Sequence, residues 1–103
     1  MADLSQEAWR KKMSEDDDVV IIDVRTDEEI EEGYIPNAVA MDIRDPSAFM
    51  ESAQKLDPSK NYYVYCRSGG RSAQACALFN SLGIKNTYNL LGGFSEWEGE
   101  KAE

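Results

Sequence analysis

Histidine is absent from the 103 residues of the sequence, and cysteine occurs only at Cys66 and Cys76. The missing imidazole excludes a Cys-His dyad and a Ser-His-Asp triad, since both use histidine as the base that activates the nucleophile. Two cysteines without histidine are also too few for the usual zinc sites, and they do not form a disulfide framework. We therefore expect no metal and no cofactor, and any nucleophile must be activated by other means.

Long hydrophobic runs are also missing, so the sequence predicts no membrane-spanning helix. The N-terminal stretch MADLSQEAW lacks the basic and apolar regions of a secretory signal, and we expect a cytoplasmic location. The length of the chain, with 42% hydrophobic residues, predicts a single domain over residues 1–103 that buries its own core.

Basic residues are few, and the net charge of −9 argues against binding to nucleic acids or anionic membranes. Acidic residues are missing between Asp57 and Glu96; this segment carries +4, while the rest of the chain carries −13. Two interpretations are open. The segment contains a buried strand and helix that lack acidic residues by chance, or it forms a local anion-binding site around Arg67 and Arg71.

Short apolar segments alternate with helix-forming segments along the chain. The runs VVIID and NYYVYC are typical of strands, and the apolar spacing from Ala75 to Leu82 is typical of an amphipathic helix. We expect strands over residues 19–23, 37–43, 61–66 and 85–90, helices over residues 5–13, 26–33, 45–56 and 71–83, and a glycine turn with a short helical end over residues 92–98. This order predicts an α/β fold, a three-layer sandwich in which helices cover both faces of a central, mainly parallel sheet.

The loop from Cys66 to Arg71 joins the best strand pattern to a helix pattern. In parallel α/β sheets, sites lie beyond the carboxyl ends of the strands, where Asp23 is also expected. Gly69 and Gly70 permit backbone conformations in which successive N–H groups point inward. Because cationic neighbours and helix N-termini lower the pKa of a cysteine to roughly 3.5–7.5, Cys66 is expected to be a thiolate nucleophile rather than a structural thiol.

Cys76 lies within the helix pattern beside alanines, which indicates a packed core thiol. A disulfide between Cys66 and Cys76 is not expected, because the rise along the helix places the two residues beyond the usual Cα separation of about 7 Å. A role of Cys76 as a resolving thiol is the weaker alternative.

Three motifs together resemble the single-domain rhodanese-like sulfurtransferases: VVIIDVRTDEEIEEGYIPNAV, YYVYCRSGGRSAQACALFNSLG and NLLGGFSEW. They occur in the order and spacing of that family and extend from about Val19 to Trp97. The resemblance implies a rhodanese-like fold in which Cys66 accepts a sulfane sulfur, becomes a persulfide, and passes the sulfur on. The donor would be a small anion such as thiosulfate, and the acceptor cyanide or a thiol.

The resemblance also implies roles for other residues. Asp23 and Arg25 match an Asp-x-Arg motif of the family, which is expected to give structural support through an ion pair or hydrogen bonds. Where many members have Gly-His-Ile-Pro, this chain has Gly-Tyr-Ile-Pro, beginning at Gly33. The arginines of the loop would hold the anionic donor, and the loop backbone would form its cradle, which makes the expected substrate-binding set Arg67, Ser68, Gly69, Gly70 and Arg71.

Two other functions fit the same motifs. A persulfide-relay module would carry sulfur between a protein donor and a protein acceptor, and the acidic surface would attract basic partners. Phosphatases and arsenate reductases on the same fold have five residues between cysteine and arginine, whereas only four separate Cys66 from Arg71. The tighter loop fits one sulfur atom better than a tetrahedral phosphate, so this alternative ranks lower.

Overall fold

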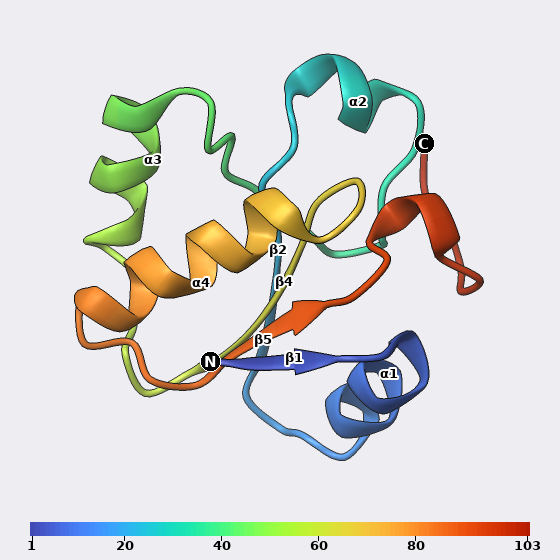
Figure 1. The fold of residues 1–103 in the computed structure, drawn as a ribbon, viewed down its shortest axis with the longest axis horizontal. Helices are drawn as coiled ribbons and strands as arrows, with labels where there is room; N and C mark the ends of the chain where they lie inside the picture. Colours follow the sequence, from blue (N-terminus) through green and yellow to red (C-terminus); the bar gives the residue numbers. More distant parts are fainter.

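The computed structural model describes all of residues 1–103 as one sheet with surrounding helices (Figure 1). The strands are β1 (Ala2–Leu4), β2 (Val19–Asp23), β3 (Val39–Ala40), β4 (Asn61–Tyr65) and β5 (Thr87–Leu90). The helices are α1 (Gln6–Ser14), α2 (Asp27–Glu31), α3 (Pro46–Ala53), α4 (Gly70–Ser81) and the 3-10 turn η1 (Phe94–Glu96). The strand order is β1-β5-β4-β2-β3, and every neighbouring pair is parallel. The predicted α/β fold is confirmed.

Helices cover both faces of the sheet, as the strand–helix alternation predicts. In Figure 1, α3 and α4 lie on one side of the sheet and α1 on the other. Side chains of β4 alternate between the two cores: Tyr62 and Val64 join the core beneath α3 and α4, whereas Tyr63 and Tyr65 join Trp9 of α1 in the second core. None of the helices is long and apolar enough to cross a membrane.

The carboxyl ends of β2 and β4 meet at one edge of the sheet. The parallel register pairs Asp23, the last residue of β2, with Tyr65, the last residue of β4. Cys66 follows directly and opens the loop to α4, which begins at Gly70. The two segments that lead into the Asp-x-Arg motif and the cysteine loop therefore end side by side.

Several boundaries expected from the sequence are confirmed at the helix ends. Thr26 and Glu29 form a reciprocal capping box at the start of α2, in which each side chain accepts a hydrogen bond from the backbone N–H of the other. Pro46 occupies the first turn of α3. Gly83 follows α4 with a φ of +90°, the left-handed conformation typical of the residue after a helix.

Two strands differ from the predictions. β1 has no counterpart among the predicted elements, because it is only three residues long and pairs with β5, at the far end of the chain. The strand expected over residues 37–43 is limited to Val39–Ala40. Shortly before β3, Asn37 takes a left-handed φ of 71°. The strand that pairs with β3 is β2, which ends at Asp23 and so leaves few residues for β3 to pair with.

Trp9 fastens α1 to the sheet. Its side chain is fully buried, its indole N–H donates to the carbonyl oxygen of Tyr88 (3.0 Å), and its ring meets those of Tyr63 and Trp97 edge-on, with centroids 5.6 and 5.7 Å away. Edge-to-face pairs of this kind add to the free energy gained from burial alone.

Replacing Trp9 with alanine is expected to lower the free energy of unfolding by about 3–5 kcal/mol, because burial is lost and a cavity remains. Urea denaturation followed by circular dichroism measures this change. Lys11→Ala, on the exposed side of the same helix, is the matched control and should stay within about 0.5 kcal/mol of the wild type. A similarly small loss in Trp9→Ala would contradict the anchoring role.

Candidate active site

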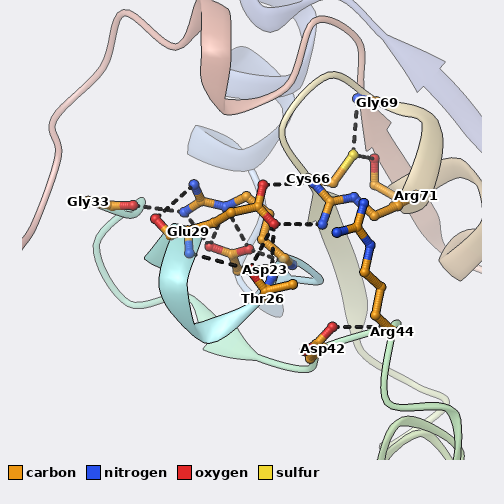
Figure 2. Close-up of polar contacts among 11 residues, drawn as sticks. Asp23, Thr26, Glu29, Gly33, Asp42, Arg44, Cys66, Gly69 and Arg71 are labelled. Carbon is orange, nitrogen blue, oxygen red and sulfur yellow. Dashed lines mark hydrogen bonds and ion pairs between the residues drawn. The ribbon is translucent and has the colours of Figure 1, made fainter. Parts of the chain in front are cut away.

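The Cys66 sulfur lies inside the loop that follows β4, and only 1% of the residue is exposed. The backbone N–H of Gly69 donates to the sulfur at 3.1 Å, and the hydroxyl of Ser72 in the first turn of α4 lies 3.4 Å from it (Figure 2). Gly69 adopts a φ of +109°, which favours glycine. The inward-facing N–H group expected of this loop is therefore present at Gly69.

Burial would by itself raise the pKa of the Cys66 thiol, but hydrogen bonds outweigh it. The Ser72 hydroxyl and the backbone N–H groups of Ser72, Gly69 and Ser68 together lower this pKa below its ordinary value. Donors of the loop and of the helix start thus favour the thiolate without a side-chain base.

The start of the loop is held from outside by the turn after β5. The backbone N–H groups of Phe94 and Ser95 donate to the carbonyl oxygens of Cys66 (2.9 Å) and Arg67 (3.0 Å). Gly93 makes this approach possible, since a Cβ at its position would lie 2.5 Å from the Arg67 carbonyl oxygen. Because these carbonyl oxygens accept hydrogen bonds from the turn outside the loop, they point away from the sulfur.

Arg71 is already paired in this structure. Its two terminal nitrogens donate to the two carboxylate oxygens of Glu29 at 2.7 and 2.8 Å (Figure 2). This forked contact is the main cause that lowers the pKa of Glu29 to about 2. Glu29 also caps α2 through Thr26, so one carboxylate ties α2 to the start of α4.

Arg67 differs from Arg71, because it is exposed and has no ion-pair partner. It borders a cleft of about 290 Å³ beside the cysteine loop. The residues that line the cleft are Arg25, Glu29, Glu32, Arg67, Phe94 and Ser95. Of the five expected substrate-binding residues, Arg67 is therefore the one whose side chain faces an open site.

Asp23 and Arg25 form a buried ion pair of 2.8 Å beneath this cleft. The Tyr65 hydroxyl donates to the Asp23 carboxylate (2.6 Å), and the Arg25 guanidinium also donates to the Gly33 carbonyl oxygen (2.8 Å). The guanidinium lies 4.4 Å from the centre of the Phe94 ring. This network links the ends of β2 and β4 to the turn that holds the cysteine loop.

Some residues near the cysteine loop and the cleft have no clear signal in the sequence. Ser72 and Asn89, both buried, lie behind the loop, and Glu32 lines the cleft. Arg44, which is exposed, extends toward Arg71 in Figure 2. Ser72 is the one that the sequence places near the cysteine, in the first helical turn after it. The other residues are distant in sequence and come close to the site only in the folded chain.

Cys76 lies in α4 and is fully buried in the core beneath the helix. Both cysteines are free thiols. Burial raises the pKa of Cys76 to about 11, in the direction opposite to Cys66. The two thiols are therefore expected to differ strongly in reactivity.

At neutral pH, iodoacetamide is expected to modify one thiol per folded chain, at Cys66. The rate should rise with pH around a midpoint below that of free cysteine, because the loop donors lower the pKa of this thiol. Intact-mass and peptide mass spectrometry measure both quantities. Cys66→Ser should abolish the modification and Cys76→Ala should leave it unchanged; modification of Cys76 at an equal rate would contradict the assignment.

Known proteins match almost the whole chain. The family model of the rhodanese-like domain matches residues 6–100. The sulfurtransferase candidate YtwF of Bacillus subtilis is 42% identical over 98 residues, which cover 95% of this chain and 91% of YtwF. The thiosulfate sulfurtransferase GlpE of Coxiella burnetii is 34% identical over 92 residues, which cover 89% of this chain and 81% of GlpE.

A solved structure agrees with these sequence relatives. The crystal structure of a rhodanese-like domain protein from Staphylococcus aureus has a TM-score of 0.80 and 33% sequence identity, and the match covers 97% of this chain and 94% of that one. The family model and these relatives show that the chain belongs to the rhodanese-like sulfurtransferase family.

Proposed function

We propose that the protein transfers a sulfane sulfur from an anionic donor such as thiosulfate, through a persulfide on Cys66, to an acceptor such as cyanide or a thiol. The observation that carries this proposal is the Cys66 sulfur enclosed by donors, with the Gly69 N–H at 3.1 Å and the Ser72 hydroxyl at 3.4 Å. Such a setting favours a negative charge on sulfur both before and after the transfer.

The first step needs only the thiolate and the donor. The Cys66 thiolate attacks the outer sulfur of thiosulfate, a new S–S bond forms, and the S–S bond of the donor breaks with its electron pair leaving on sulfite. In the second step cyanide attacks the outer sulfur of the persulfide, thiocyanate departs, and the thiolate is restored. Charge and electrons balance in both steps, so neither an oxidant nor a proton is required.

Arg67 and Arg71 have different roles in this proposal. The Arg71 guanidinium is committed to Glu29, whereas Arg67 borders the cleft of about 290 Å³ without an ion-pair partner. We therefore assign Arg67 the contact with the oxyanion end of the donor, since a guanidinium offers a fork of donors to such oxygens. Arg71 would act from its fixed place as a positive charge near the sulfur.

Incubation with thiosulfate is expected to add one sulfur atom to the wild-type protein, and subsequent cyanide should remove it as thiocyanate. Intact-mass spectrometry and a thiocyanate assay follow the two steps. Cys66→Ser should gain no sulfur, while Cys76→Ala, the matched control, should behave as wild type. Equal turnover by Cys66→Ser would overturn the proposal, and fast loading by a protein persulfide with negligible use of thiosulfate would favour the relay.

Arg67→Ala is expected to raise the KM for thiosulfate about ten- to a hundredfold, the loss expected for one charge-assisted hydrogen bond. Use of an uncharged sulfane-sulfur donor, such as an organic trisulfide, should change much less, because it has no oxyanion to hold. Steady-state kinetics with both donors measure the difference. Lys85→Ala removes a positive charge from the same acid-free segment and serves as the control. Equal losses for both donors would argue against an anion contact at Arg67.

A further inference from the structure

A buried amide lies directly behind the reactive sulfur. Asn89 of β5 is 1% exposed, and its side-chain N–H groups donate to the Gly69 carbonyl oxygen (3.2 Å) and to the carboxylate of Asp3 in β1 (2.9 Å). Its side-chain oxygen accepts a short hydrogen bond from the Ser72 hydroxyl. Ser72 is the residue whose hydroxyl also faces the Cys66 sulfur, at 3.4 Å.

The Ser72 hydroxyl has one proton and two acceptors. A hydroxyl donates a single hydrogen bond, so it can serve the Cys66 sulfur or the Asn89 oxygen, but not both. Ser72 and Asn89 are 0% and 1% exposed, so bulk water has little access to replace the missing donor. Whichever acceptor loses the proton is left without this donor, which carries a free-energy cost.

The direction of the Asn89 amide is set by its other contacts. Both of its N–H hydrogens are used, one by the Gly69 carbonyl and one by the Asp3 carboxylate. A flipped amide would place its oxygen against these two oxygens, which repel it. The amide oxygen is thus held toward Ser72, and Asp3, on an exposed edge strand, contributes to this choice.

We propose that Asn89 is a positioning residue that competes with the Cys66 sulfur for the Ser72 proton, and that Asp3 fixes the amide in the orientation that makes it compete. When the sulfur is a neutral thiol, Ser72 donates to Asn89. When the sulfur is a thiolate, the hydroxyl turns toward it and Asn89 loses its donor. Because the Ser72–Asn89 hydrogen bond must break when the thiolate forms, the competition reduces the stabilisation of the thiolate, and a less stabilised thiolate is the stronger nucleophile.

The test is a titration of the Cys66 thiol in the full chain, followed by its ultraviolet absorbance as a thiolate. A Cys76→Ala background ensures that only Cys66 is observed. Ser72→Ala should lower the acid dissociation constant of Cys66, because a donor to the thiolate is lost. Asn89→Leu, which removes the competing oxygen, should increase it about two- to tenfold, the range expected for one hydrogen bond.

The combined Ser72→Ala/Asn89→Leu variant separates competition from a general structural effect. If Asn89 acts through the Ser72 proton, the double variant should titrate like Ser72→Ala alone. Asp3→Ala, at an exposed position, provides a second route if Asn89→Leu does not fold. In the Cys76→Ala background, Asp3→Ala should raise the acid dissociation constant of Cys66. The rise should be smaller when Ser72→Ala is also present, because only the loss of the Asp3 negative charge then acts on the thiol.

The inference would be overturned if Asn89→Leu left the dissociation constant of Cys66 unchanged or lowered it. It would also be overturned if Asn89→Leu or Asp3→Ala had the same effect with and without the Ser72 hydroxyl. Where Asn89→Leu does not fold, the Asp3→Ala pair decides in the same way. The titration uses no sulfur donor, so its outcome is independent of the proposed transfer reaction. If the titrations come out as predicted but the protein does not take up sulfur, the proposed function is rejected and the role of Asn89 still holds.

Discussion

A negative charge on a buried sulfur is stable only where donors are fixed around it before the reaction begins. In this chain the donors belong to a short loop and to the first turn of α4. The loop keeps its shape because the N–H groups of Phe94 and Ser95 donate to the carbonyl oxygens of Cys66 and Arg67. Gly93 is required for that contact, since a side chain there would collide with the loop. The turn after β5 therefore carries no reactive group but helps to fix the shape of the cysteine loop.

The basic residues of the acid-free segment lie in different parts of the fold. Of the four basic residues in the acid-free segment, Arg71 is paired with Glu29 and Lys60 lies 3.5 Å from Asp18. Lys85 precedes β5 and lies near the amino ends of the parallel strands, whereas the cysteine loop follows the carboxyl end of β4. Of the four basic residues in that segment, Arg67 is therefore the one that lines the cleft without an ion-pair partner.

Features encoded in neighbouring residues were predictable, and features that join distant segments were not. The strand that ends directly before Cys66, the loop glycines and the Thr26–Glu29 capping box are local, and the sequence alone indicates them. The Arg71–Glu29 pair spans 42 positions and the Asn89–Asp3 bond spans 86. Neither can be read from spacing, because each exists only after the parallel strands have been placed in order.

The proposed sulfur transfer places two opposed requirements on the site. Donors around Cys66 must favour the thiolate at neutral pH in a chain that has no histidine to remove the proton. The same donors withdraw electron density from the sulfur, and the nucleophilicity of a thiolate falls as its pKa falls. Backbone donors such as the Gly69 N–H cannot be withdrawn, whereas the Ser72 hydroxyl can rotate toward Asn89. Under the proposed competition, one adjustable donor beside fixed ones would stabilise the thiolate less than a full set of fixed donors, and would so preserve more of its nucleophilicity.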